Sequence, residues 1–121
     1  MHFRAEQRLR RQADFQRVRA EGRRLDSGGF TLWHVARPVG ENTPAIARVG
    51  VVASRAAVGN AVHRNRAKRR LREIFRHHQQ LVPSGYDVLL VARHSLNRLG
   101  LREIESKFIE SCRKILPPKN V

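Results

Sequence analysis

The sequence predicts one α+β domain in which helices pack on a single β-sheet. Residues 30–36 read as a strand, with Phe30, Leu32 and His34 facing one way and Thr31, Trp33 and Val35 the other. Residues 60–80 repeat apolar side chains at helical spacing. The elements follow the order helix, strands, helix, strand, helix. A chain of 121 residues with 40% hydrophobic residues can form one core without metals or disulfides. We therefore expect residues 1–121 to be a single domain.

The first half is predicted to contain a short helix followed by two strands. Residues 1–11 are polar and basic, so we expect a flexible segment there. Asp14 marks the N-cap or first turn of a helix that ends at Gly22. After a glycine pair, residues 30–36 form one strand and residues 46–53 form a second, more buried strand.

The second half is predicted to contain two helices around one strand. The long helix begins at Val58 or Asn60 and ends near Gln80, because proline and glycine follow at residues 83–85. The remaining elements are a buried strand over 87–92, a helix over 101–116 and a short tail over 117–121.

The charge of the chain indicates a polyanionic partner. Lys and Arg number 25 against 10 acids, which gives a formal net charge of +15. Four of these bases are Lys and the other 21 are Arg, whose planar fork binds phosphate bidentately. A GC-rich genome could explain the Arg-to-Lys ratio, but it does not explain the net charge. Nucleic acid is the leading candidate, and an anionic membrane surface is the second.

Several classes of protein are excluded or disfavoured. Cys112 is the only cysteine, which excludes an internal disulfide and a thiolate metal cluster. No signal peptide or apolar run of membrane-spanning length is present, so we expect a cytoplasmic protein. No P-loop, nucleophile motif or acidic cluster for two-metal chemistry appears. Adjacent His77 and His78 point about 100° apart on a helix, which disfavours a shared metal or catalytic site.

The long helix separates into two faces when its residues are placed about 100° apart. The apolar face is predicted to comprise Ala67, Leu71, Ile74, Phe75, His78 and Val82. The opposite face is almost purely basic and comprises Asn65, Arg66, Arg69, Arg72 and Arg76, with Arg64 and Lys68 nearer the core. A merely solvated face would mix acids with bases at helical spacing, whereas here Glu73 is the only acid. The pattern favours a binding face.

Four stretches of the chain match one known family in order and at similar intervals. They are residues 8–11 with 14–18, 48–52 with 59–62, 64–69 with 72–73, and 87–93. The third contains the sequence Arg64-Asn65-Arg66, and the whole series resembles the bacterial ribonuclease P protein subunit. The resemblance implies an α-β-β-β-α-β-α fold like domain 2 of ribosomal protein S5, with a left-handed βαβ crossover. General topology rules would favour a right-handed one.

The resemblance also implies a function. The chain is expected to be the protein subunit of an endoribonuclease whose catalyst is RNA, and to assist removal of the 5′ leader from precursor tRNA. Its expected partners are ribonuclease P RNA and precursor tRNA, with no membrane and no small-molecule cofactor. No cofactor is expected on the protein itself, and magnesium is expected for the RNA-catalysed reaction.

The resemblance assigns two sets of binding residues and neither catalytic nor metal-binding residues. Contact with the catalytic RNA is expected from Arg64, Asn65, Arg66, Lys68, Arg69 and Arg72. The leader-binding cleft is expected to contain Phe15, Arg19, Phe30, Trp33, Arg55 and Asn60. From the residues alone, Phe30 is better explained as a core side chain, and Trp33 fits a core or a cleft equally well.

Two positions depart from the family, and two other functions remain open. Arg19 stands where many members have an aromatic side chain, and Ala56 follows Arg55 where paired lysines are common. The main alternative is a ribosomal or general RNA chaperone protein of the same fold. Binding of double-stranded DNA is less favoured, because the basic face offers many phosphate contacts and few base readers.

Overall fold

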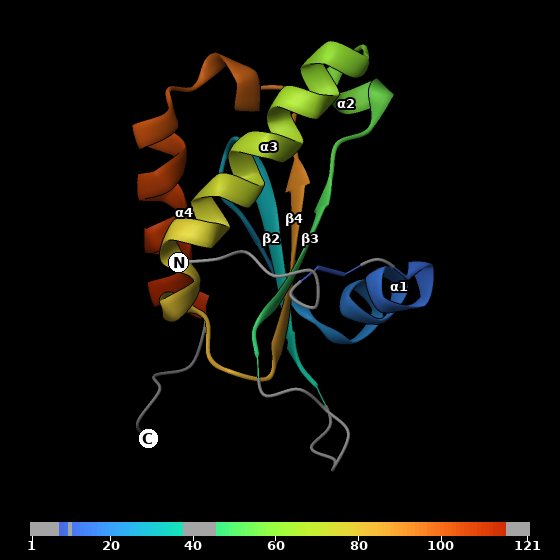
Figure 1. Ribbon diagram of the computed structural model, residues 1–121, viewed down its shortest axis with the longest axis vertical. Helices are drawn as coiled ribbons and strands as arrows, with labels where there is room; N and C mark the ends of the chain where they lie inside the picture. Colours follow the sequence, from blue (N-terminus) through green and yellow to red (C-terminus); the bar gives the residue numbers. More distant parts are fainter. Residues whose placement is uncertain (1–7, 10, 38–45, 116–121) are drawn as a thin grey trace.

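The computed structural model describes residues 8–9, 11–37 and 46–115 (Figure 1). Its main elements are α1 (Gln12–Glu21), β1 (Arg23–Asp26), β2 (Phe30–Ala36), β3 (Arg48–Val52), α2 (Arg55–Val58), α3 (Ala61–His78), β4 (Tyr86–Ala92) and α4 (Leu101–Ile115). Two 3₁₀ turns, Gln79–Leu81 and Leu96–Arg98, precede β4 and α4 respectively. The predicted tail over 117–121 lies outside the described residues, as do residues 1–7 and 10 of the segment expected to be flexible.

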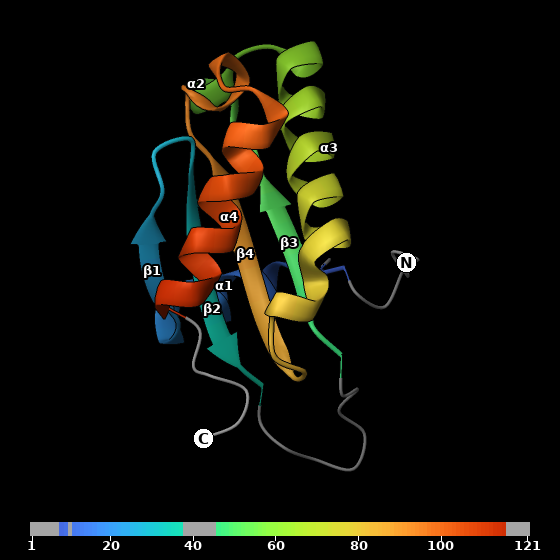
Figure 2. The same cartoon turned by 90° about the vertical axis from the view of Figure 1, so that its left-hand side faces the viewer.

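The four strands form one mixed sheet in the order β1-β2-β4-β3. β2 pairs antiparallel with both β1 and β4, whereas β3 pairs parallel with β4. Figure 2 looks onto the side of the sheet that carries α4, with β3 to the right of β4 and both strands running upward. The chain passes from β3 through α3 to β4 on its left, so the crossover is left-handed. The predicted α-β-β-β-α-β-α fold is confirmed.

Helices cover both faces of the sheet. α3 and α4 pack on one face around a core that includes Phe30, Leu32 and Leu90. α1 packs on the other face, where Val18 and Leu89 are fully buried, and Figure 1 shows α1 across the sheet from α3 and α4. Alternation along β2 therefore sends side chains into two different environments, as the sequence predicts.

The predicted helix boundaries agree closely with the structure, because local capping sets them. Asn60 caps α3 by accepting a hydrogen bond from the His63 amide at 3.1 Å. Asp14 lies in the first turn of α1, and Gly22 is its C-cap. Strand β1 and the one-turn helix α2 were not located from the residues themselves, because each has only four residues and shows no periodic pattern.

The N-terminal segment is fixed at Arg8 and Leu9, where flexibility was expected. The Leu9 amide donates a hydrogen bond of 2.8 Å to the Val49 carbonyl, and Arg8 forms an isolated parallel β-bridge with Val49. Leu9 is buried with Val18 and Leu89. The segment thus covers the free edge of β3 and carries Arg8 toward the side of α3.

Strand β2 also buries a histidine, which predicts a pH dependence of stability. Neither ring nitrogen of His34 has a hydrogen-bond partner within the described chain, and burial lowers the pKa of His34 below 6.5. The unfolded chain therefore binds this proton more readily than the folded chain does. We expect the free energy of unfolding to fall as pH drops from about 7 to about 5.

Urea unfolding at several pH values measures this dependence, and the variant His34→Phe is its control. Phenylalanine can keep the ring stacking with Tyr86, whose centroid lies 6.1 Å from that of His34, and it cannot titrate. Equal pH dependence in both proteins would contradict the assignment to His34.

Candidate nucleic-acid interface

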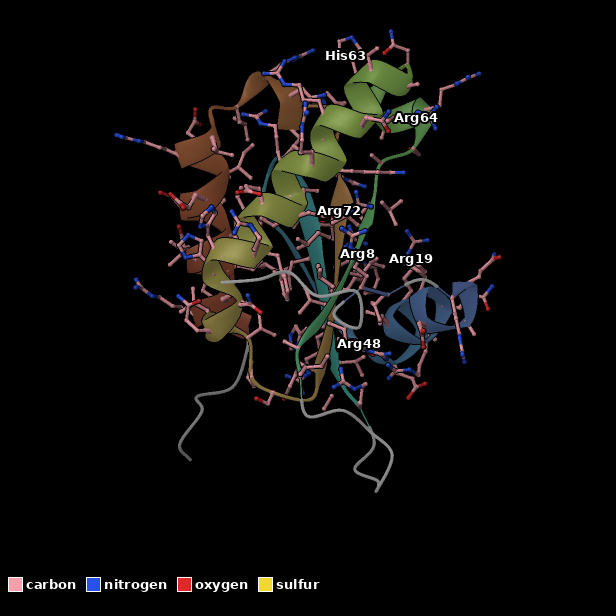
Figure 3. The ribbon with its side chains drawn as sticks, viewed as in Figure 1. Arg8, Arg19, Arg48, His63, Arg64 and Arg72 are labelled. Carbon is pink, nitrogen blue, oxygen red and sulfur yellow. The ribbon has the colours of Figure 1, made fainter. Side chains whose placement is uncertain are left out.

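Helix α3 presents the two faces that its periodicity predicts. Its fully buried side chains are Ala67, Leu71, Ile74 and Phe75. The side chains predicted to contact RNA all lie outside this core, three exposed and three partly buried: Asn65, Arg66 and Arg69, then Arg64, Lys68 and Arg72. Figure 3 shows Arg64 and Arg72 at different heights along the same helix, so the basic face extends over several turns.

One arginine of α3 has a structural role instead. The Arg70 guanidinium donates hydrogen bonds to the carbonyls of Leu96 and Leu99, at 3.4 and 2.6 Å. Burial lowers the pKa of Arg70. These contacts connect α3 to the turn that precedes α4, so Arg70 does not belong to the basic face.

A basic hollow lies where α3 faces the N-terminal segment. It has a volume of about 370 Å³ and is lined by Arg8, Arg69, Arg72, Glu73 and Arg76. Arg76 and His77 contact the Glu73 carboxylate through side-chain nitrogens and hold the pKa of that carboxyl below its usual value. Burial, and then the nearby charge of Arg8, lowers the pKa of Arg72. Like charges that converge in a partly desolvated place favour the binding of an anion.

A second hollow, the tryptophan pocket, lies between α1 and the opposite face of the sheet. Its volume is about 340 Å³, and its lining residues are Arg19, Arg24, Thr31, Trp33, Val91 and Arg93. The strand register explains this grouping, because Arg24 pairs with Trp33 across β1 and β2, and Thr31 pairs with Val91 across β2 and β4. Directly paired residues project to the same face of a sheet. Cations and an indole ring thereby share one concave surface.

Phe15 lies against β3 because residue 50 has no side chain. A Cβ atom at Gly50 would come within 2.5 Å of the Phe15 ring and 3.2 Å of the Leu9 Cβ. We expect Gly50→Ala to displace Phe15 and α1, and to lower the free energy of unfolding by about 1–3 kcal/mol. Urea unfolding measures the loss. As a control, Gly100→Ala adds a methyl group where no heavy atom lies within 4 Å. An unchanged Gly50→Ala variant would contradict the close contact.

Helix α1 is attached to the sheet by a buried carboxylate. Asp87 is completely buried at the start of β4, and its carboxylate accepts hydrogen bonds from Arg17, Arg37 and Arg48. The contacts to Arg37 and Arg48 measure 2.6 and 2.8 Å, and hydrogen bonding to Asp87 raises the pKa of Arg48. No local sequence pattern indicates this arginine cluster, because its members lie up to 70 residues apart.

The structure brings together only part of the predicted leader cleft. Arg19 and Trp33 line the tryptophan pocket, and Phe15 packs nearby on the same face of the sheet. Phe30 is wrongly placed by the prediction, because it is 0% exposed in the core beneath α3 and α4. Asn60 uses its side-chain oxygen to cap α3, and Arg55 is exposed on α2, which packs against α3. The prediction did not include Arg24 and Arg93, which line the tryptophan pocket, or Arg8, which lines the basic hollow beside α3.

Nowhere among the described residues do three His, Cys, Asp or Glu side chains gather as a metal site. Cys112 is buried, which raises the pKa of its thiol to about 12. Of the helices described, none is both long and apolar enough to cross a membrane.

Comparison with known proteins identifies the family. The family model described as Ribonuclease P matches residues 3–116. The chain belongs to the ribonuclease P protein family. A ribonuclease P protein component from Petrotoga mobilis is 32% identical over 117 residues, covering 93% of this chain and 94% of that relative. One from Natranaerobius thermophilus is 34% identical over 114 residues, covering 93% and 94%.

Solved structures of ribonuclease P proteins show the same fold. The protein from Thermotoga maritima superposes with a TM-score of 0.76 at 27% identity, covering 91% of this chain and 98% of that one. The Staphylococcus aureus protein gives 0.74 at 25% identity, covering 92% and 98%. The ribonuclease P family implies a ribonucleoprotein that processes tRNA, and the basic composition of this chain agrees with that.

Proposed function

We propose that this chain binds the catalytic RNA of ribonuclease P and the 5′ leader of precursor tRNA, and assists endonucleolytic removal of that leader. The observation that carries the proposal is the presence of two separate arginine-lined hollows, one beside α3 and one between α1 and the sheet. Two such surfaces allow one small domain to contact two RNA segments at once.

The α3 side suits a structured RNA. Its arginines project from one rigid helix, so their spacing is fixed before binding, and guanidinium groups bind phosphates bidentately. Arg66 and Arg69 are exposed and have no ion-pair partner among the described residues. We propose this face, together with Asn65 and the basic hollow, as the contact with the catalytic RNA.

The α1 side suits an unpaired strand. Single-stranded RNA is bound by aromatic platforms next to cations, because every base has a face that can stack. Trp33 is partly exposed and lies beside Arg19 and Arg24 in the tryptophan pocket. We propose this pocket and the neighbouring Phe15 as the leader cleft.

The chemistry of cleavage is assigned to the RNA. Arginine and asparagine can hold phosphates and neutralise charge, but they do not act as general bases near neutral pH. We propose that the protein has no catalytic residues and binds no cofactor, and that the magnesium required for cleavage is held by the RNA.

Reconstitution tests the proposal. Precursor tRNA is incubated with the catalytic RNA at low magnesium, with and without this chain, and 5′ cleavage is followed. We expect the chain to restore cleavage, and its effect on substrate affinity to grow with leader length only when the catalytic RNA is present. Failure to restore cleavage would refute the function. Multiple-turnover cleavage by the chain alone would refute an RNA catalyst, and leader-length dependence without the RNA would favour a general RNA chaperone.

A further inference from the structure

The first part of α3 extends past the hydrophobic core. None of residues 61–66, the overhanging segment, is buried, and the buried side chains of the helix begin at Ala67. Figure 1 shows the one-turn helix α2 beside this end of α3, and α2 contains no buried residue either. Arg64, Asn65 and Arg66 lie in the overhanging segment and belong to the predicted contact with the catalytic RNA. Burial of apolar side chains therefore contributes little to fixing their positions.

Hydrogen bonds from the 3₁₀ turn that precedes α4 hold this part of the helix. The Asn97 side-chain amide donates to the His63 carbonyl at 3.0 Å, and Figure 2 shows the connection from β4 to α4 passing beside the upper end of α3. The Arg70 guanidinium donates to the Leu96 and Leu99 carbonyls at 3.4 and 2.6 Å. His63 and Arg70 are about two helical turns apart, so they lie on the same side of α3. The turn thus contacts α3 at two points and brackets the stretch between them.

The 3₁₀ turn is itself fixed to the rest of the domain. Leu96 is fully buried in the core beneath α3 and α4. The Arg93 amide donates to the Gly29 carbonyl at 2.9 Å, and the Ser95 hydroxyl donates to the Gly28 carbonyl at 3.0 Å. The loop between β1 and β2 therefore anchors the start of the connection. A turn that is anchored on two sides forms a firm support for the helix that lies against it.

We infer that Arg70 and Asn97 are positioning residues for RNA binding. They bind backbone carbonyls and not the RNA, and they hold the overhanging segment in the orientation in which Arg66 and its neighbours meet phosphates. Without them the segment samples other orientations in the free chain. Ordering it on binding then costs affinity, while the phosphate contacts in the complex stay the same. The inference rests on the proposed binding of the catalytic RNA by α3.

Backbone NMR relaxation of the full chain tests the support without RNA. Order parameters report motion on the picosecond-to-nanosecond timescale, and relaxation dispersion reports microsecond-to-millisecond exchange. We expect Arg70→Gln and Asn97→Ala to lower the order parameters of residues 61–66 or to add exchange there, while residues 71–78 keep their natural values. Unchanged relaxation of residues 61–66, or the same change along the whole helix, would overturn the support.

Binding of the catalytic RNA at several salt concentrations separates positioning from direct contact. Arg69→Gln removes an exposed arginine next to Arg70 and should make the slope of log affinity against log salt less steep by about one. We expect Arg70→Gln to lower affinity by about 3- to 10-fold, the factor for a lost hydrogen bond, with a nearly unchanged slope. The uncharged change Asn97→Ala should act in the same way. Arg102→Gln, at an exposed position on α4, gives the effect of losing one charge elsewhere.

Two results of the binding experiment would overturn the positioning role. One is a slope that Arg70→Gln reduces as much as Arg69→Gln does, because Arg70 would then contact a phosphate itself. The other is an affinity that Arg70→Gln and Asn97→Ala lower no more than Arg102→Gln does.

Failure of this inference and failure of the proposed function can be distinguished. If the natural chain does not bind the catalytic RNA, the proposed function fails, and the relaxation of the free chain still decides whether Arg70 and Asn97 support α3. If the natural chain binds the RNA and both variants match it in relaxation and affinity, the positioning role fails and the proposed function stands.

Discussion

Asp87→Asn is expected to destabilise the domain by about 3–5 kcal/mol, a large part of the roughly 5–15 kcal/mol that stabilises a typical domain. The substitution removes the carboxylate that pairs with Arg37, whose side chain is 5% exposed, and it weakens the contacts to Arg17 and Arg48. A buried cation that loses a carboxylate partner has less charge to compensate for its lost hydration. Equilibrium unfolding in urea measures the change.

Two variants make the Asp87 prediction specific. Glu110→Gln breaks an exposed i,i+4 ion pair with Lys114 and should leave the unfolding midpoint almost unchanged. Arg17→Gln removes only the link from α1 and should cost less stability than Asp87→Asn, while weakening binding in the tryptophan pocket. The structural role of Asp87 would be contradicted if Asp87→Asn unfolded at the same urea concentration as the natural chain.

The double variant Arg69→Gln/Arg72→Gln is expected to lower affinity for the catalytic RNA by about 10- to 100-fold near physiological salt. Both side chains line the basic hollow, and neither has an acidic partner among the described residues. If each binds one phosphate, the slope of log affinity against log salt should become less steep by about two. Binding measured at several salt concentrations tests both numbers.

A charge-matched variant separates site-specific contacts from general attraction. Arg102→Gln/Arg113→Gln removes two exposed arginines from α4, so it lowers the net charge equally. We expect a small loss of affinity from this pair. If both double variants lost the same affinity and slope, the basic hollow would contribute only net charge.

Much of the fold could be predicted from the sequence, because much of it is encoded locally. The two faces of α3 follow from the spacing of Leu71, Ile74 and Phe75 at helical intervals. Asn60 caps the start of α3 and Gly22 caps the end of α1, through hydrogen bonds that involve only near neighbours. The alternation in β2 shows which side chains share a face, although it does not show which face receives which helix.

The site was less predictable, because residues distant in sequence build it. Phe30 and Trp33 are both aromatic residues of β2, yet only the packing of the helices decides their roles. α3 and α4 bury Phe30 in the core on one face of the sheet, and α1 on the other face leaves Trp33 at the border of a pocket. Arg24 joins the pocket because the register of β1 places it opposite Trp33. Residues 23–26 show no periodic pattern from which that pairing could be predicted.

By itself, the sequence determined the helices and longer strands, the basic face of α3 and, through its resemblance, the family and its fold. Only the tertiary structure decided that Arg8 and Arg72 line the same hollow and that three arginines donate hydrogen bonds to Asp87. It also placed the Arg24 guanidinium over the Trp33 ring. The physical reason is the distance along the chain over which each kind of interaction acts. Periodicity and capping act within a few residues, whereas ion pairs and strand registers depend on long-range chain packing that leaves no local pattern.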